Sequence, residues 1–274
     1  MRKIVFDLQD LREISPVFNN KIIAFWMKRI LKWLDFEKVN QIHASHCHVN
    51  GAAFTSAMLA DPIMDVKYLI HHKERLDSLP QGAFITVSNH PIGSLDGVIL
   101  IDIFASIRDD FKLMVNEILG KVGALSDTWI QVQPIKGEQT TSNFANTGGV
   151  RAALSWLRGG HPIGFFPAGA MSFKNKKKQV RDRPWTHSSI RLIRKANVPV
   201  YPVLFDCCNS PFFYWLGKVN WKLRTLRIPA ETFNKRGKTF DIYIGQPISP
   251  QIIQQYTDDT ELADFLYQAT YDLK

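Results

Sequence analysis

The stretch Asn89-His90-Pro91-Ile92-Gly93-Ser94-Leu95-Asp96-Gly97 separates two apolar runs, at residues 83–87 and 98–104. The first run is short and partly β-branched, which predicts a buried strand. The second run begins just after Asp96, so Asp96 is predicted to be the N-cap of a helix. A strand, a tight loop and a helix would hold His90 and Asp96 within hydrogen-bond reach. A histidine oriented by a carboxylate is suited to acid–base catalysis.

Two other interpretations of this stretch remain open from the residues alone. His90 could be a loop histidine that is satisfied by the backbone, with Asp96 acting only as a helix cap. Ser94 could be a hydrolase nucleophile, but the Gly-x-Ser-x-Gly turn of such enzymes fails because position 92 is isoleucine. We therefore expect no nucleophilic serine here.

Downstream of this stretch, short apolar segments alternate with amphipathic ones. Such alternation predicts an α/β fold, with a mixed β-sheet flanked by helices. Pro184 is predicted to lie in the first turn of its helix. The predicted helices are residues 147–158 and 184–196 and two pieces that begin near Ser249 and Asp259. The predicted strands are residues 111–115, 128–133, 163–166, 198–205, 223–228 and 239–244.

The N-terminal part is predicted to be a helical appendage, residues 1–75, on an α/β domain of residues 76–274. Residues 20–35 form a helix with a basic arc and a wide apolar face that carries Trp26 and Trp33. This pattern predicts a helix in a membrane interface, although docking on the protein's own core is the alternative. Residues 40–75 are also predicted to be helical. The basic arc consists of Lys21, Lys28, Arg29 and Lys32.

Charge and composition restrict the partners of the chain. The formal net charge is +9 over 274 residues, which favours an anionic partner: nucleic acid, an anionic membrane, an acidic carrier protein or a phosphorylated substrate. No nucleic-acid-binding motif is present, so we expect no nucleic-acid partner. His43, His46 and Cys47 lack a second ligand pair at recognisable spacing, so no metal site is expected.

Compartment and membrane topology follow from the same composition. Three cysteines, Cys47, Cys207 and Cys208, are no disulfide framework and suit a reducing compartment. Acidic residues interrupt the apolar character of the first residues, so no secretory signal is expected. No apolar run reaches the roughly 18 to 20 residues that a bilayer span needs. We therefore expect a protein that is soluble or lies on a membrane surface.

Four segments in sequence order resemble the conserved blocks of the glycerolipid (lysophospholipid) acyltransferase superfamily. They are residues 89–97, 129–134, 165–172 and 198–203. These segments depart from the superfamily's usual motifs at several positions. The departures resemble the haemolysin-like branch, whose members include enzymes that acylate bacterial glycine and ornithine lipids. The Asn209-Ser210 pair after the fourth block also resembles that branch. The departures are five rather than four residues between His90 and Asp96, Ala168 in place of glutamate, Met171 in place of arginine, and Gln133-Pro134 in place of an arginine at the end of the second block.

The resemblance implies a bacterial O-acyltransferase on the cytoplasmic face of the inner membrane. The donor would be an acyl thioester of acyl carrier protein or coenzyme A, which is a co-substrate, so no bound cofactor is expected. The acceptor would be a lysolipid. Loss of the phosphate-associated glutamate and arginine favours a lyso-aminolipid acceptor over lysophosphatidate, which remains the alternative together with other lysophospholipids. A basic membrane- or nucleic-acid-binding protein without enzymatic activity is the alternative from another class.

His90 is expected to be the general base, and Asp96 to fix its tautomer. Backbone N–H groups near Gly169 and Ala170 are candidates for stabilising the oxyanion. The basic run at residues 174–183 could hold coenzyme A phosphates, acyl carrier protein or lipid head groups, or be a solvated loop. The predicted substrate-binding residues are Asn89, Gly93, Ser94, Pro167, Ala168, Gly169, Ala170, Ser172, Arg181 and Arg183.

Overall fold

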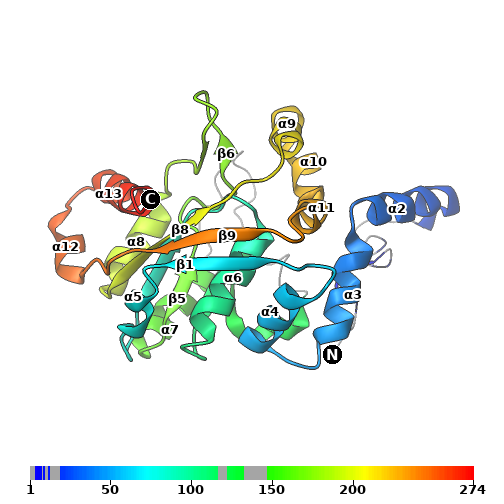
Figure 1. Cartoon of the computed structure of the whole chain (residues 1–274). Helices are drawn as coiled ribbons and strands as arrows, with labels where there is room; N and C mark the ends of the chain where they lie inside the picture. Colours follow the sequence, from blue (N-terminus) through cyan, green and yellow to red (C-terminus); the bar gives the residue numbers. More distant parts are fainter. Residues whose placement is uncertain (1–3, 8, 10–11, 13–18, 117–121, 133–146) are drawn as a thin grey trace.

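A mixed seven-stranded sheet forms the centre of the computed structural model, which describes residues 4–7, 9, 12, 19–116, 122–132 and 147–274. The strand order is β1-β9-β8-β2-β5-β3-β4 (Figure 1). Neighbours pair parallel except β8 and β9, which are antiparallel. The predicted mixed sheet is thereby confirmed. The strands are β1 (Lys67–His71), β2 (Ile85–Ser88), β3 (Lys112–Asn116), β4 (Trp129–Val132), β5 (Ile163–Phe165), β8 (Val200–Asp206) and β9 (Thr239–Ile244).

Helices cover both faces of this sheet. Successive residues of a strand point to opposite faces, and in β3 Leu113 and Val115 belong to one apolar cluster whereas Met114 belongs to the other. The first cluster packs against α4 (Gly51–Ala60) and α6 (Ser94–Ala105). The second packs against three helices, so a three-layer arrangement results. These helices are α7 (Thr147–Arg158), α8 (His187–Ala196) and α13 (Asp259–Tyr271).

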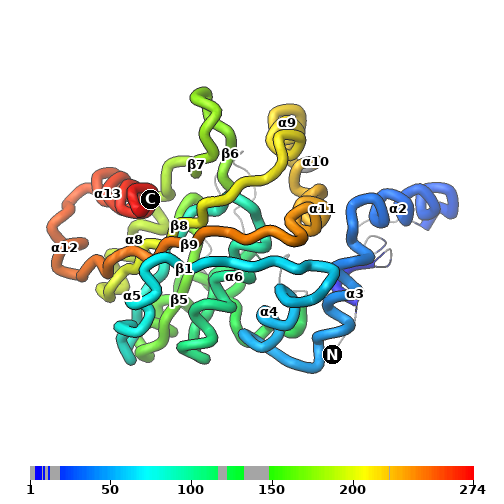
Figure 2. Tube along the Cα trace, viewed as in Figure 1, coloured from blue at the N-terminus to red at the C-terminus, as the bar shows by residue number. Residues whose placement is uncertain are grey.

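The remaining elements lie around the sheet, and the tube in Figure 2 shows their paths. A small antiparallel hairpin, β6 (Phe173–Lys174) and β7 (Val180–Arg181), stands beside α9. The other elements are α2 (Lys21–Trp33), α3 (Phe36–His46), α5 (Glu74–Asp77), the 3₁₀ helix η3 (Gly123–Thr128), α9 (Pro211–Val219), α10 (Trp221–Leu226), α11 (Ile228–Phe233) and α12 (Pro250–Gln255).

Three secondary-structure predictions are wrong. The end of the predicted helix at residues 40–75 is strand β1, which pairs with β9 and so extends the sheet into the predicted appendage. Residues 223–228 are helical in α10 and the start of α11, because they lie outside the sheet and their amides bond within the helices. Pro184 precedes its helix, which begins at His187 after the N-cap Thr186.

Helix α2 keeps its apolar face away from the core. Only Ala24 is buried, while Trp26 and Trp33 are 59% and 64% exposed. In Figure 1 the helix projects from the molecule next to α3. Docking of this helix on the core of its own chain, the alternative considered from the sequence, is therefore not what the structure shows. Within the described residues, no helix is long and apolar enough to cross a membrane.

Candidate active site

The loop between β2 and α6 holds a histidine–aspartate pair. His90 Nδ1 lies 2.9 Å from Asp96 Oδ2, as the sequence predicted. The same oxygen accepts the backbone N–H groups of Ile92 and Gly93, each at 3.0 Å. Asp96 is the third residue of α6 and Gly93 is the N-cap, so the predicted N-cap position of Asp96 is wrong. The carboxylate that caps the helix start thus also orients the histidine.

Asp96 is completely buried, and this burial raises the pKa of its carboxyl above the ordinary value. Hydrogen bonds from His90, Ile92 and Gly93 oppose the shift. Its Oδ1 has no hydrogen-bond partner among the described residues. Burial of this carboxylate is therefore unfavourable, and the hydrogen bonds that it accepts from described residues all come from the loop that carries the histidine.

The imidazole of His90 is fixed on its other side by an aromatic ring. It stacks on Phe166 with a centroid distance of 3.9 Å, and 18% of its side chain is exposed. Because Nδ1 keeps its proton and donates it in a hydrogen bond to Asp96, Nε2 is the basic nitrogen of the neutral ring. Among the described residues Nε2 has no hydrogen-bond partner. The geometry suits a base that takes a proton from a bound molecule.

Residues 165–172, the third block, pack directly against the histidine. The Ser172 N–H donates to the His90 carbonyl at 2.8 Å, and Pro167 and Ala168 are buried beneath the loop. The Gly169 N–H is used in a turn with the carbonyl of Phe166, so this expected oxyanion donor is already occupied. The Ala170 N–H has no partner within the described part of the chain. Ala170 is therefore the better candidate of the two.

The side chain of Asn89 is used by the sheet. Its amide donates to the Phe205 carbonyl at 3.0 Å and accepts the Phe205 N–H at 2.7 Å, and the residue is 4% exposed. These bonds join the ends of β2 and β8, so the predicted substrate contact of Asn89 does not fit. Ser94 is half-buried at the start of α6. Gly93 has φ 87°, a conformation that disfavours side chains, and an added Cβ would lie 2.9 Å from Met171 Sδ.

Asp182 is a site residue that the sequence did not reveal. Its Oδ1 accepts the His90 N–H at 3.2 Å and the Ser172 hydroxyl, and Trp185 donates to Oδ2 at 3.4 Å. The Asp182 N–H donates to the Tyr271 hydroxyl at 2.8 Å. One carboxylate thus joins the histidine loop, the third block and the segment before α8. The 92 residues between Asp182 and His90 explain why no local pattern indicates it.

Burial raises the pKa of Asp182 from 3.8 to about 6, against the opposing effect of its hydrogen bonds. A carboxyl whose pKa is raised in the folded state lowers the free energy of unfolding as pH rises through that interval, by about 1.4 kcal/mol per pKa unit. Asp182→Asn removes this charge. We expect the free energy of unfolding of the variant, relative to wild type, to increase by about 2 kcal/mol between pH 4 and pH 7. Urea unfolding at both pH values measures it; an equal difference at the two values contradicts it.

A second set of buried residues braces the loop from the side of α11. The Asn209 amide donates to the Pro91 carbonyl at 3.3 Å. Its oxygen accepts from Lys235, which is 2% exposed and also donates to the Glu231 carbonyl at 3.0 Å. Glu231 accepts the Ser210 N–H at 3.0 Å. The Asn209-Ser210 pair, noted in the sequence as a marker of resemblance, therefore supports the loop that carries His90.

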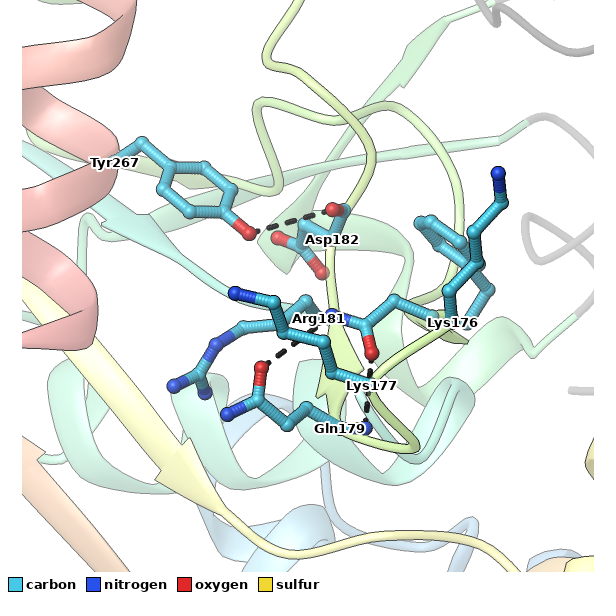
Figure 3. A pocket seen from close by; sticks show the side chains of 8 residues that line it. Lys176, Lys177, Gln179, Arg181, Asp182 and Tyr267 are labelled. Atoms are coloured by element: carbon cyan, nitrogen blue, oxygen red, sulfur yellow. Dashed lines mark hydrogen bonds between the residues drawn. The ribbon is translucent and has the colours of Figure 1, made fainter.

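Arg181 and Arg183 lie on different sides of Asp182. The Arg181 guanidinium carbon is 4.4 Å from the Tyr271 ring centroid, and that of Arg183 is 5.7 Å from the Phe173 ring. Arg181 lines a pocket of about 600 Å³, shown in Figure 3, which Asp182 separates from His90. The other lining residues are Phe173, Asn175, Lys176, Lys177, Gln179, Asp182 and Tyr267.

Within the described residues, no group of three His, Cys, Asp or Glu side chains is placed to hold a metal ion. The three cysteines are free thiols, and burial raises the pKa of Cys207 well above its ordinary value. Gln133-Pro134, at the end of the second block, lies outside the described residues.

Comparisons with known proteins agree with this geometry. A lyso-glycine lipid O-acyltransferase of Bacteroides thetaiotaomicron is 27% identical over 270 residues, covering 96% of this chain and 95% of that protein. One from Phocaeicola vulgatus is 27% identical over 206 residues, covering 72% and 71%.

The fold has a counterpart among solved structures. The crystal structure of the 1-acyl-sn-glycerophosphate acyltransferase PlsC from Thermotoga maritima matches with a TM-score of 0.52 at 14% identity, covering 91% of this chain and 87% of that one. The family model described as acyltransferase matches residues 9–274. The chain therefore belongs to the acyltransferase family and is an acyltransferase.

Proposed function

We propose that the enzyme transfers a fatty acyl chain from an acyl thioester to the hydroxyl of a lysolipid, with His90 as general base. The observation that carries the proposal is the His90–Asp96 pair, which leaves Nε2 free of protein partners among the described residues. Both curated relatives are named for O-acylation of a lyso-glycine lipid, which supports a lysolipid acceptor with a carboxylate in its headgroup. Family membership favours an enzyme over a non-catalytic basic binding protein.

The proposed reaction needs no covalent enzyme intermediate. The acceptor hydroxyl gives its proton to His90 Nε2 while its oxygen attacks the thioester carbonyl carbon. The resulting oxyanion accepts a hydrogen bond from the Ala170 N–H. When the intermediate collapses, the carbon–sulfur bond breaks and the imidazolium returns its proton to the leaving thiolate. Asp96 keeps the proton on Nδ1 and stabilises the imidazolium between these steps.

The donor is proposed to be a thioester of acyl carrier protein or coenzyme A, bound through the hairpin β6–β7 and its pocket. Lys176, Lys177 and Arg181 line this pocket, and they form no ion pair with the described carboxylates. Figure 3 shows these basic side chains gathered around the hairpin near Asp182. Cations without protein counter-ions attract either an acidic protein or the phosphates of coenzyme A.

Thioester consumption by the purified protein tests the proposal. Acyl carrier protein and coenzyme A donors are each combined with lyso-glycine lipid, lyso-ornithine lipid or lysophosphatidate. We expect transfer to a lyso-aminolipid, with product ester detected by mass spectrometry. A preference for lysophosphatidate would identify the alternative acceptor. Absence of ester with every combination would contradict the proposed reaction.

We also propose that α2 and the pair α9–α10 bind an anionic membrane surface, at the inner face of the inner membrane. Phe212 and Trp215 of α9 are 44% and 55% exposed. The Arg227 guanidinium carbon lies 5.3 Å from the Trp33 ring centroid and 5.0 Å from that of Phe212, so α2 and α9 meet at this residue. Exposed aromatic residues with adjacent cations suit the interface of an anionic bilayer.

Replacing Phe25 and Trp26 together by alanine is expected to weaken vesicle binding at least about tenfold, because each side chain buried in lipid contributes about 1.5–3 kcal/mol. Co-sedimentation with vesicles containing anionic lipid measures this affinity. Ile252→Ala is the matched control, since Ile252 is also exposed but lies on α12. Equal loss of binding in the control, or none in the double variant, would contradict the assignment.

A further inference from the structure

Arg183 and Arg224 come from separate elements and meet beside one apolar cluster. Arg183 stands after β7 with its guanidinium carbon 5.7 Å from the ring centroid of Phe173 in β6. Arg224, in α10, places its guanidinium carbon 5.6 Å from the ring centroid of Phe213 in α9. Because α9 packs on both β6 and α10, the two arginines lie near the same junction.

Neither arginine has an acidic partner among the described residues. Two other part-buried arginines are ion-paired: Arg108 with Asp110 at 2.7 Å, and Arg194 with Asp259 at 2.9 Å. Arg183 and Arg224 have no such carboxylate, and among the described residues their buried Nε atoms have no hydrogen-bond partner. Two guanidinium groups near one junction, neither with a carboxylate partner among the described residues, are suited to bind an anion from outside the protein.

Electrostatics agrees with this geometry. Desolvation, followed by the positive charge of Arg183, lowers the pKa of Arg224 below its ordinary value. The protein therefore bears the cost of holding two positive charges together in a partly buried place. A bound anion would offset both contributions, since it replaces lost hydration with charge-assisted hydrogen bonds.

The junction lies next to the catalytic loop. The apolar cluster consists of Met171, Phe213 and Tyr214, with Val180 and Ile228 packed against it. Met171 Sδ is the atom that a Cβ on Gly93 would meet, and the Tyr214 hydroxyl donates to the Pro91 carbonyl at 3.5 Å. Arg183 directly follows Asp182, whose carboxylate accepts the His90 N–H. An anion held here is therefore separated from His90 by little more than one layer of side chains.

We propose that Arg183 and Arg224 together form an anion site that binds the headgroup carboxylate of the lysolipid acceptor. The assignment rests on the proposed function and specifies how the acceptor is recognised. Met171 stands in the third block where the resembling motif has an arginine. In this chain the positive charge comes instead from two side chains outside that block. A pair of forked donors matches the planar geometry of a carboxylate.

Binding without turnover tests the site directly. The full chain is titrated with N-dodecanoylglycine and with its uncharged methyl ester, below their micelle concentrations. We expect wild type to bind the acid at least about tenfold more tightly than the ester, because charge-assisted hydrogen bonds contribute about 1.5–3 kcal/mol. Arg183→Gln and Arg224→Gln should each weaken binding of the acid about tenfold and leave the ester unchanged. Lys218→Gln, an exposed charge on α9, is the matched control.

Equal affinities of wild type for the acid and the ester would overturn the assignment. Equal weakening of both ligands by the Arg224→Gln variant would do the same, because it would indicate a general loss of structure. Arg224→Lys, which keeps the charge without the forked donors, should retain an intermediate preference for the acid.

Steady-state kinetics separates the acceptor from the donor. We expect the arginine variants to raise KM for lyso-glycine lipid about tenfold or more with little change in kcat. A rise in KM for the acyl thioester instead would overturn the assignment, because it would place donor phosphates at the site. If wild type catalyses no transfer, the proposed function fails, whereas the binding preference for the acid still decides the anion site.

Discussion

Replacing His90 by alanine is expected to lower kcat for acyl transfer by about 10²–10⁴-fold, the contribution of a positioned general base. The imidazole is held by Asp96 at 2.9 Å and by the Phe166 ring, so no neighbouring group among the described residues replaces its Nε2. KM for the thioester and the lysolipid should change little. Initial rates from thiol release, together with product ester by mass spectrometry, measure the effect.

His161→Ala is the matched control for this experiment. His161 Nδ1 lies 2.7 Å from Asp110 Oδ2 and its ring stacks on Trp156, so the same chemical pair is removed elsewhere in the fold. We expect this variant to keep its kcat. If His90→Ala stays active, or if both variants lose activity together, His90 is not the base.

The second large effect is expected for Asp96→Asn, which should lower kcat by about 10²–10⁴-fold at almost unchanged size and shape. Oδ2 of Asp96 accepts from His90, Ile92 and Gly93, so an amide oxygen that keeps these bonds places its NH₂ group at the buried, unpartnered Oδ1 position. The imidazolium also loses its neighbouring negative charge. The measurement is kcat across pH 5–9, with circular dichroism to show folding.

Asp102→Asn provides the comparison within the same helix. Asp102 is also buried in α6, but it accepts from the hydroxyls of Thr55 and Tyr68, away from the catalytic loop. This variant should lower the free energy of unfolding and keep kcat per folded molecule. The assignment of Asp96 would be wrong if the two aspartate variants had the same kinetic phenotype.

Local sequence patterns predicted those parts of the site that lie within one turn of the chain. The strand before His90, the helix after Gly93 and the His90–Asp96 hydrogen bond all follow from residues within a short stretch. The exact cap was not predicted, because an aspartate at a helix start is typical both of the N-cap, where it accepts amides of the first turn, and of the third helical position, where it accepts amides that precede the helix.

Contacts between distant segments could not be predicted. Asp182 reaches the His90 N–H across 92 residues, and Asn209 reaches Pro91 across 118. Asn89 was predicted to contact substrate, whereas its side-chain amide bonds to Phe205 on another strand. Sequence spacing carries no information on such pairings unless the sheet order is known.

Errors in the strand assignment have the same physical origin. Residues 67–71 form the edge strand β1, half-exposed and without the strong apolar run that identifies β2. Residues 223–228 mix apolar, basic and polar side chains, but no strand of the described sheet pairs with them, and they form helices. Whether such a segment forms a strand or a helix depends on the neighbouring strands that the fold places beside it.

The central position of β2 has a consequence for synthesis on the ribosome. Its two neighbours, β5 and β8, follow it by more than seventy residues. The hydrogen bonds of β2 to these strands therefore join residues far apart in the sequence, a feature typical of slow folding. A nascent chain that has reached residue 170 carries His90 and Asp96 but lacks Asp182 and Phe205. The acid–base pair is therefore braced late in translation, at about the time that α9 emerges with its exposed aromatic residues. We expect the unfinished chain to depend on chaperones until β5 and β8 complete the sheet around β2.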